Sequence, residues 1–206
     1  MEQRVEKEPN LILDIENPPV FCEVSEQDGF IVKDTFSKER RIRKYTYDLL
    51  KKAQKNLPPG YQFVIYEAYR PLKVQISEWE RMKAKIEAEN PDFTPEDVLI
   101  RLEDFVANPY TTGSGHQSGA AVDITLAFQG QECDMGSPIN EAIPESYTAC
   151  EAISEEGKKN RQLLKTVLED VGFVNYPSEW WHYSFGDRLW ARLTGSALAI
   201  FGKVDI

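Results

Sequence analysis

The sequence predicts one globular α+β domain, and three observations lead to that expectation. The chain has 206 residues, a length that suits one domain, and 41% of them are hydrophobic, which is sufficient for a substantial core. Some stretches carry apolar residues at helical spacing, whereas others alternate as strands do. There is no internal repeat, linker or low-complexity tract, so the domain is expected to span residues 1–206, with residues 1–10 frayed.

The first elements are expected to be short strands between residues 11 and 33, where apolar runs are separated by turns that contain proline and glycine. A helix over about 39–56 follows, because its apolar residues have helical spacing, and the segment Leu57-Pro58-Pro59-Gly60 ends it. A small basic cluster near its start is interpreted as a solvated helix face. Its members are Lys38, Arg40, Arg41, Arg43 and Lys44.

The middle of the chain is expected to form a central strand and two helices. Residues 61–68 include the run Phe63-Val64-Ile65-Tyr66, which is apolar on both sides, as a central strand should be. Pro71 opens a helix that runs to about residue 89. A further helix over about 95–106 is expected to begin after Thr94 as N-cap, with proline at its first position.

The last third is expected to hold two strands, two helices and two irregular stretches, 108–119 and 129–154. In the strand over 120–128, three apolar residues face one way, whereas Asp123 and Thr125 face the other. A helix capped by Ser154 is expected to run to about residue 171. A strand over 179–185 and a final helix over 187–198 complete the predicted elements.

The charge balance excludes two classes of partner. Lys and Arg number 24 and Asp and Glu number 34, so the formal net charge is −10. Binding to duplex nucleic acid or to an anionic membrane requires a cationic surface, so neither partner is expected. No segment approaches the roughly 18 apolar residues of a membrane span, and the charged N-terminus lacks a secretory signal. We therefore expect a cytoplasmic protein.

The cysteines and histidines restrict the kinds of metal site. The three cysteines are odd in number and lack C-x-x-C spacing, so free buried thiols are expected, with neither a disulfide framework nor a four-thiolate zinc site. The chain has only two histidines, which excludes a three-histidine zinc site. A catalytic zinc would therefore need a carboxylate as its third protein ligand. The alternative is that two scattered histidines are incidental.

One histidine lies in the segment from Ser114 to Asp123. His116 occupies a glycine-flanked loop that returns into a strand, and Asp123 points off that strand away from its apolar face. A carboxylate in so apolar a segment either faces solvent or has a positively charged partner, because burying it unpaired is costly.

The other histidine lies in the aromatic segment Ser178 to Tyr183. Glu179 and His182 are three residues apart, and in a regular strand such residues face opposite ways, so we expect Glu179 before the strand, turned back by the chain. This arrangement suits a metal ligand with a general base beside it. The alternative is an aromatic core strand with a hydrogen-bonded histidine. Because each histidine has an acid nearby, the set favours a zinc-dependent hydrolase.

Arg70 follows the predicted central strand and precedes a helix. Its permanent charge and fixed fork of donors could stabilise an oxyanion. The alternative is a surface arginine at the start of a helix, paired with a neighbouring acid.

Three motifs in this order and spacing resemble a known family. They are Tyr69-Arg70-Pro71, Ser114-x-His116-x-x-Gly119-x-Ala121-x-Asp123 and Glu179-Trp180-Trp181-His182-Tyr183. The chain resembles the zinc-dependent D-alanyl-D-alanine dipeptidases, including the vancomycin-resistance dipeptidases, over roughly residues 32–183. The resemblance implies a central, mostly antiparallel sheet flanked by helices, a fold shared with bacterial D,D-carboxypeptidases and with the hedgehog signalling domain.

The resemblance also implies an activity and a set of roles. The family cleaves free D-Ala-D-Ala into two D-alanines in the cytoplasm, so a small D,D-dipeptide is the expected substrate. Glu179 resembles the base that deprotonates the attacking water, Arg70 the arginine that stabilises the oxyanion, and Ser114 a serine that contacts the substrate. One zinc ion per chain is expected, and its implied ligands are His116, Asp123 and His182.

One departure from the family puts the substrate in doubt. The loop Met135-Gly136-Ser137 is followed by Asn140 where the dipeptidases have an aspartate that holds the substrate ammonium. Losing that charge-assisted hydrogen bond would weaken binding of a free amine about 10- to 100-fold. Either Glu141 replaces it or the substrate is an N-acylated peptide, bound beside Asn140.

Two other functions remain open at this point. One is a D,D-carboxypeptidase or another cell-wall peptidase that acts on longer or N-acylated peptides. The other is a zinc-stabilised binding domain without catalysis, although such a domain would need neither the base nor the arginine. The sequence also leaves open whether the chain forms a homo-oligomer.

Overall fold

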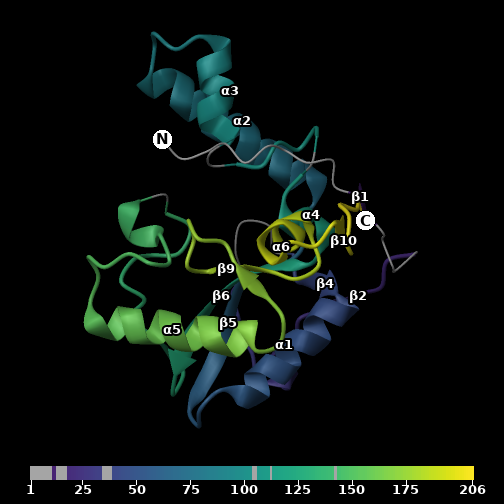
Figure 1. Cartoon of the computed structure of the whole chain (residues 1–206), viewed down its shortest axis with the longest axis vertical. Helices are drawn as coiled ribbons and strands as arrows, with labels where there is room; N and C mark the ends of the chain where they lie inside the picture. Colours follow the sequence, from purple (N-terminus) through teal and green to yellow (C-terminus); the bar gives the residue numbers. More distant parts are fainter. Residues whose placement is uncertain (1–10, 13–17, 34–38, 104–105, 112, 142) are drawn as a thin grey trace.

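A mostly antiparallel sheet of six strands lies at the centre of the structure, a computed structural model that describes residues 11–12, 18–33, 39–103, 106–111, 113–141 and 143–206 (Figure 1). Among the described strands of this sheet, the β3–β5 pair is parallel and the other pairs are antiparallel. The α+β class and the mostly antiparallel sheet are therefore confirmed. In spatial order the strands are β3 (Ile31–Val32), β5 (Tyr61–Glu67), β6 (Ala121–Phe128), β9 (His182–Ser184) and β8 (Val174–Asn175), with β7 (Gln131–Glu132) paired to β6.

Two helices pack on the apolar face of this sheet. They are α1 (Lys44–Asn56) and α5 (Glu155–Glu169), which contact each other and lie in the lower half of Figure 1. Leu50 of α1 and Leu164 of α5 belong to the same buried cluster as the inward residues of the strands. Those strand residues include Phe63, Ile65, Val122, Ile124, Leu126, Trp181 and Tyr183.

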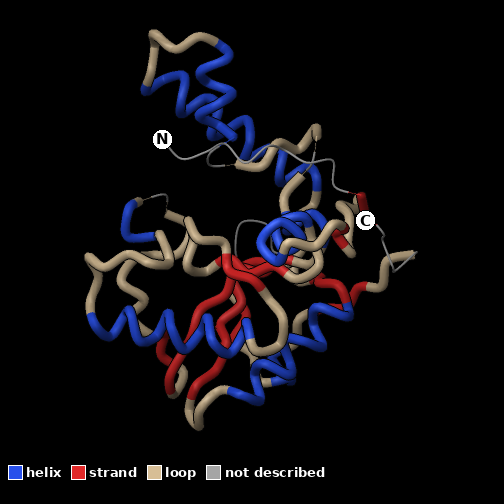
Figure 2. The backbone as a smooth tube through the Cα atoms, viewed as in Figure 1, coloured by secondary structure: helices blue, strands red, loops and turns tan. Residues whose placement is uncertain are grey.

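A helical hairpin projects from this body. It consists of α2 (Leu72–Glu89) and α3 (Pro95–Glu103), seen at the top of Figure 2. The hairpin has its own small core, formed by Trp79, Ile86, Val98 and Leu102. Thr94 caps α3 as predicted, because its Oγ accepts a hydrogen bond from the Asp97 amide at 3.2 Å.

Two short sheets, two short α-helices and two 3₁₀ helices, η1 (Glu26–Asp28) and η2 (Pro144–Ser146), complete the described elements. In one sheet β2 (Phe21–Glu23) pairs with β4 (Arg41–Arg43), and in the other β1 (Leu11–Ile12) pairs with β10 (Leu198–Ala199). The α-helices are α4 (Gly115–Ser118) and α6 (Arg188–Thr194). Of the described helices, none is long and apolar enough to cross a lipid bilayer.

The helix predicted over 39–56 begins later than expected. Residues Arg41–Arg43 form β4, and α1 starts at Lys44. The apolar spacing that includes Ile42 is compatible with a helix, but backbone pairing with β2 competes for these residues and prevails.

The interpretation of the basic cluster as a solvated helix face is wrong for Arg43. This side chain is fully buried, its Nε donates to the Ser118 carbonyl at 2.7 Å, and its guanidinium lies 4.5 Å from the ring centre of Phe201. Arg43 therefore ties β4 to the segment that carries His116. Lys38 lies outside the described residues, as do residues 1–10 that were expected to fray.

Smaller differences concern loops and ends. The predicted loop over 108–119 contains the single turn α4, and the strand predicted over 179–185 is shortened to β9. The final helix ends at Thr194 because Gly195 takes a left-handed conformation, φ +71°, and β8 and β10 were not predicted. The three cysteines are free as expected, but they are half-buried rather than buried.

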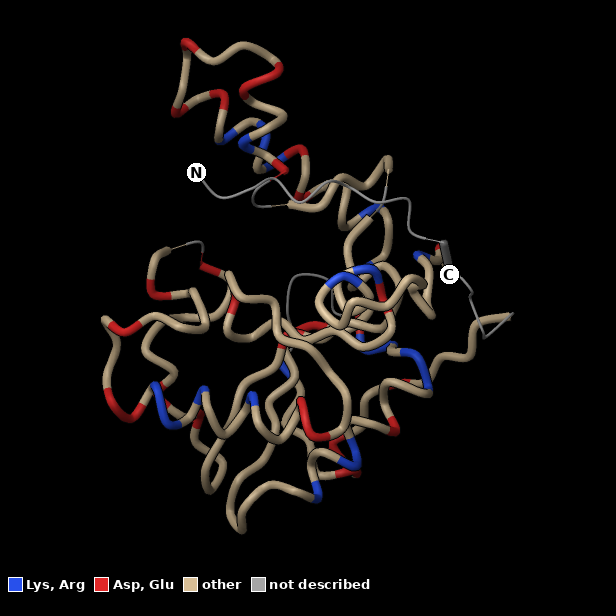
Figure 3. Tube along the Cα trace, viewed as in Figure 1, with Lys and Arg blue, Asp and Glu red and all other residues tan. Residues whose placement is uncertain are grey.

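Charged residues of both signs lie along α1, α2 and α5, as Figure 3 shows. Several form ion pairs one helical turn apart, such as Lys85 with Glu89 and Lys165 with Glu169. These side chains are exposed, so each pair contributes only about 0.3–0.5 kcal/mol. The surface charges therefore solubilise the helices rather than hold the fold together.

Arg161 of α5 fixes the long segment that follows β7. Its buried guanidinium donates to the carbonyl oxygens of Met135 at 2.6 Å, Tyr147 at 2.8 Å and Glu145 at 2.7 Å, and to Ser137 Oγ at 3.2 Å. Since buried carbonyl groups require hydrogen-bond partners, this one side chain determines the path of the segment.

Arg161→Lys is expected to destabilise the fold by about 2 kcal/mol, because an ammonium group cannot reach all four acceptors and leaves some of them unsatisfied. Urea unfolding measures the effect. Arg192→Lys, an exposed arginine of α6, is the control and should change the free energy of unfolding by less than about 0.5 kcal/mol. Equal stabilities of the two variants would contradict this role of Arg161.

Candidate metal centre

The polar face of the sheet is built around the pairing of β6 with β9. Asp123 of β6 lies opposite His182 of β9 in the register of the two strands. Val122 and Tyr183 point into the apolar core, so strand alternation turns Asp123 and His182 to the opposite face. Both side chains are buried.

His116 reaches the same point from α4. Gly119 ends this single turn in a left-handed conformation, φ +70°, and leads the chain directly into β6. The backbone N–H of Arg70 donates to the His116 carbonyl at 3.1 Å, which ties α4 to the segment after β5. His116 is buried as well, so three polar side chains from two strands and one turn meet away from water.

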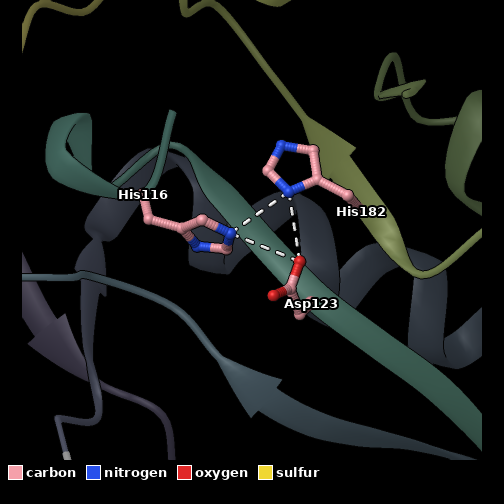
Figure 4. A group of neighbouring side chains, drawn as sticks. All are labelled: His116, Asp123 and His182. Carbon is pink, nitrogen blue, oxygen red and sulfur yellow. Dashed lines mark hydrogen bonds and ion pairs between the residues drawn. The ribbon is translucent and has the colours of Figure 1, made fainter. Parts of the chain in front are cut away.

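The side chains of His116, Asp123 and His182 place one potential ligand atom each close to the other two, as Figure 4 shows. His116 Nε2 lies 3.1 Å from His182 Nδ1, and Asp123 Oδ1 lies 3.1 Å from His182 Nδ1 and 3.3 Å from His116 Nε2. Ligand atoms in a tetrahedral zinc site with bonds of 2.0–2.1 Å are about 3.3–3.4 Å apart. The two nitrogens and one oxygen therefore fit the spacing and the donor chemistry of such a site.

Hydrogen bonds on the outer side of each ring orient the histidines. His116 Nδ1 lies 2.9 Å from the Ala68 carbonyl, which can only accept, so Nδ1 carries the proton and Nε2 presents a lone pair. His182 Nε2 lies 3.3 Å from Ser184 Oγ. The inner nitrogens of both rings point toward Asp123.

The site has an excess of negative charge. Burial alone would raise the pKa of Asp123, but the adjacent His116 and His182 outweigh it and hold the pKa below its usual range. Burial alone would lower the pKa of His182, but its hydrogen bond to Asp123 and the charges of three carboxylates raise it. A divalent cation would compensate the buried charge in the same way that protonated histidines do.

Glu179 lies beside these groups, with Oε2 3.9 Å from His182 Nδ1. The predicted turn before the strand is present, because Glu179 N–H donates to the Tyr176 carbonyl and the His182 N–H donates to the Glu179 carbonyl. Asn175 of β8 fixes this turn by donating to the carbonyls of Glu179 and His182 at 3.1 Å each. Burial raises the pKa of Glu179, which keeps its carboxylate a better proton acceptor than an exposed one.

Arg70 lies near the triad and is held by its own partners. Its Nε donates to Glu67 Oε1 at 2.8 Å, its Nη2 pairs with Glu67 Oε2, and its Nη1 donates to Gln75 Oε1 at 3.0 Å. Burial lowers the pKa of Arg70, but the carboxylates of Glu67, Asp123 and Glu179 raise it above its usual value. Arg70 is paired with an acid, as the alternative interpretation expected, but its side chain is only 15% exposed and therefore does not lie at the surface.

Ser114 and Asn140 differ in their positions. Ser114 is the N-cap residue of α4, and its Oγ is buried with no hydrogen-bond partner among the described residues. Asn140 is exposed and has φ +65°. A cavity lies next to the site, between the strands and the segment after β7. Asn140 does not line this cavity.

That cavity has a volume of about 520 Å³. Thr125 forms part of its wall two residues beyond Asp123 on the same face of β6, and its hydroxyl has no hydrogen-bond partner among the described residues. Trp180, the neighbour of Glu179, lines it as well. The other lining residues are Tyr66, Glu132, Cys133, Asp134, Met135, Gly136, Ser137, Pro138 and Ile139.

Sequence reasoning missed the residues that orient the site. Glu67 precedes Arg70 by three residues within the same motif, and that spacing in a buried segment was a signal for the pair. Ser184 lies two residues after His182 in β9, and strand alternation was a signal that it faces the same side. Asn175 and Asp187 have no such signal, because they reach the site through the packing of β8 and α6.

The chain matches the model of a known family. Residues 25–196 match the family described as D-ala-D-ala dipeptidase. This range contains all of the site residues described above.

Curated relatives carry the same description. The chain is 34% identical over 178 residues to a D-alanyl-D-alanine dipeptidase of Synechocystis, covering 73% of this chain and 72% of that protein. It is also 34% identical over 125 residues to a D-alanyl-D-alanine dipeptidase of Escherichia coli, covering 60% of this chain and 55% of that protein.

A solved structure described as VanYB in complex with D-Alanine-D-Alanine is similar to the chain as well. The TM-score is 0.46 and the sequence identity 21%, over 81% of this chain and 83% of that chain.

Removing one ligand of the triad is expected to abolish metal binding. His116→Ala should weaken the affinity for a divalent metal by more than about 100-fold. Loss of a group that only hydrogen-bonds to a ligand typically weakens metal affinity by about 10- to 100-fold, and loss of the ligand itself should have a larger effect. Competition with a chromophoric chelator measures the affinity. The chain has no third histidine for comparison, so Cys150→Ala, a half-buried potential ligand outside the triad, is the control and should bind as the unaltered chain does. Unchanged affinity in His116→Ala would contradict the site.

Proposed function

Because the chain belongs to the D-ala-D-ala dipeptidase family, we propose that it hydrolyses D-alanyl-D-alanine to two D-alanines with one bound zinc ion. The observation that supports this most strongly is the convergence of three ligand atoms at 3.1–3.3 Å near a carboxylate and a mostly buried arginine. Holding a metal requires only the first three groups. The last two are those that amide hydrolysis needs.

In this proposal the zinc ligands are His116 Nε2, Asp123 Oδ1 and His182 Nδ1. Zinc with three protein ligands keeps a fourth position open and supplies Lewis acidity that lowers the pKa of water and polarises a carbonyl. Two nitrogens and one carboxylate oxygen suit zinc better than calcium or magnesium, which prefer oxygen ligands only.

Glu179 acts as the general base. Its carboxylate takes a proton from the water that attacks the amide carbonyl, and it then delivers this proton to the leaving amine. No histidine outside the triad is present to do so, since the chain has only two. Burial supports this role, because it raises the pKa of Glu179 toward the range in which the group can both accept and donate.

Arg70 stabilises the negative charge that develops on the carbonyl oxygen. Its fork is already fixed by Glu67 and Gln75, so no side-chain ordering is required when the charge appears. Ser114 contacts the substrate through its unpartnered hydroxyl. The substrate is small and no nucleic acid or membrane is involved, in keeping with the net charge of −10. We propose that the whole chain forms one catalytic domain and acts in the cytoplasm.

A second candidate keeps the chemistry and changes the substrate to longer or N-acylated D,D-peptides. Two observations favour it. Asn140 is uncharged where the family has an acid, and the cavity of about 520 Å³ beyond Thr125 offers room for more than a dipeptide. In that case Asn140 would contact the acylated end of the peptide.

Glu179→Gln is expected to lower turnover of D-Ala-D-Ala by about 10²- to 10⁴-fold and to leave zinc binding intact, because the amide cannot accept a proton. Release of D-alanine and zinc content are measured on the same sample. Glu155→Gln, an exposed glutamate of α5, is the control and should be fully active. A zinc-loaded Glu179→Gln variant with normal turnover would refute the mechanism.

Removal of Arg70 should lower kcat by about 10²- to 10³-fold with a smaller effect on KM, because its charge acts mainly on the transition state. The test uses Arg70→Ala combined with Glu67→Gln, so that no buried carboxylate is left without its partner. The exposed pair Glu78–Arg81 has the same spacing, and its Gln and Ala variants are the control. An effect confined to KM would contradict the role of Arg70.

The two candidate substrates are separated by one comparison. If the dipeptide is the substrate, free D-Ala-D-Ala should give a kcat/KM at least about 10-fold above that of its N-acetyl form. A preference for the acetylated or longer peptides would support the second candidate. Asn140→Asp should then shift the preference toward the free amine by about 10- to 100-fold.

A further inference from the structure

A buried carboxylate lies behind the metal centre and takes no part in the proposed reaction. Asp187 is 2% exposed and caps α6, with its Oδ1 accepting the Trp190 N–H at 2.9 Å. Its other oxygen, Oδ2, is buried without a hydrogen-bond partner among the described residues. A cap alone needs one oxygen, so the second oxygen requires another explanation.

The surroundings of Asp187 Oδ2 connect the two histidine-bearing segments. A Cβ at position 115 would collide with Asp187 Oδ2 and would come within 3.3 Å of Ser184 Oγ. Gly115 is therefore required by this close approach, and it immediately precedes His116. The carboxylate lies against α4 on one side and close to β9 on the other.

Ser184 lies between Asp187 and His182. Its fully buried hydroxyl is 3.3 Å from His182 Nε2, the nitrogen that faces away from Asp123. Burial raises the pKa of Asp187 above its usual value, although the Trp190 amide, Ser184 and the nearby histidines act in the opposite direction and limit the rise. Ser184 is the side chain placed to serve Oδ2, because both oxygens lie within 3.3 Å of the same point beside Gly115. A hydroxyl proton turned toward the carboxylate leaves the Ser184 oxygen to accept from His182 Nε2–H.

We propose that Asp187 is a positioning residue that acts through Ser184 to keep the proton of His182 on Nε2, so that Nδ1 offers its lone pair to the metal. In this proposal the three side chains Asp187, Ser184 and His182 form a hydrogen-bonded series, called the relay below. The carboxylate of Asp187 fixes the direction of both hydrogen bonds, because it can only accept. His116 is oriented in the same way by the Ala68 carbonyl, so each histidine has an acceptor behind it. This inference rests on the metal centre of the proposed function.

Asp187→Asn tests the charge while it preserves the shape. Asparagine is as good a helix cap as aspartate, so its Oδ1 keeps the bond from Trp190. Its amide nitrogen then takes the place of Oδ2 and donates to Ser184, which turns the Ser184 hydroxyl toward His182 Nε2 and favours the tautomer with Nδ1 protonated. We expect zinc affinity to fall about 10- to 100-fold, as is typical for loss of a group behind a ligand.

Zinc affinity is measured by chelator competition on the full chain, and the unfolding midpoint of each metal-free variant shows that it is folded. A double-mutant cycle with Ser184→Ala tests the relay, since Asp187→Asn should have an effect of less than about 2-fold once Ser184 is absent. Thr94→Ala removes the cap of α3 in the projecting hairpin and is the control, with unchanged zinc affinity.

Two results would refute the role of Asp187 and leave the metal centre itself in place. The first is an unchanged zinc affinity in Asp187→Asn. The second is a full effect of Asp187→Asn in the Ser184→Ala background, which would mean that the charge acts without Ser184. If the unaltered chain itself failed to bind zinc, the metal centre and the role of Asp187 would both be refuted. Ser184→Ala is also expected to weaken zinc binding about 10-fold or more, which tests the relay without altering the cap.

Discussion

Asp123 and His182 face each other across the ladder between β6 and β9, and the rest of the site is arranged around this pair. Because side chains alternate along a strand, a shift of the register by one residue would turn His182 into the core and bring Tyr183 or Trp181 to the polar face. The apolar residues on the other face prevent such a shift, since Val122, Ile124 and Tyr183 are fully buried under α1 and α5. The hydrophobic core therefore sets the geometry of the metal centre.

The polar face of the sheet carries an unusual number of buried ionisable groups. Asp123, Glu67, Arg70 and Asp187 are all largely removed from water, and each has a partner that offsets the cost of its burial. Arg70 compensates Glu67, and helix and hydroxyl groups surround Asp187. Asp123 has only the two histidines, which are neutral unless they bind a proton. A divalent metal would be a suitable partner for this group, so the charge balance of the site agrees with the proposed chemistry.

The site also combines rigid and open parts. The ligands lie on strands and on one short turn that is fixed by Arg43, Arg70 and the Gly119 corner. The cavity beyond Thr125 is bordered instead by the segment after β7, which Arg161 holds through hydrogen bonds to carbonyl groups. The positions of the triad thus depend on the sheet, whereas the shape of the cavity depends on a loop.

The sequence by itself determined the local elements and the identity of the reacting groups. The alternation in β6, the Ser154 cap of α5 and the turn that carries Glu179 follow from neighbouring residues, and they agree with the structure. The three motifs also contain every group that converges on the site.

Only the tertiary structure decided which of several locally acceptable states each remaining segment adopts. Residues 41–43 form a strand because β2 pairs with them, and Arg43 is buried because carbonyl and aromatic groups from distant segments surround it. The close approach of Asp187 to Gly115, next to His116, depends on packing between distant segments, which no local pattern reports. The physical reason is that dielectric environment and hydrogen-bond partners arise from contacts between segments far apart in the chain.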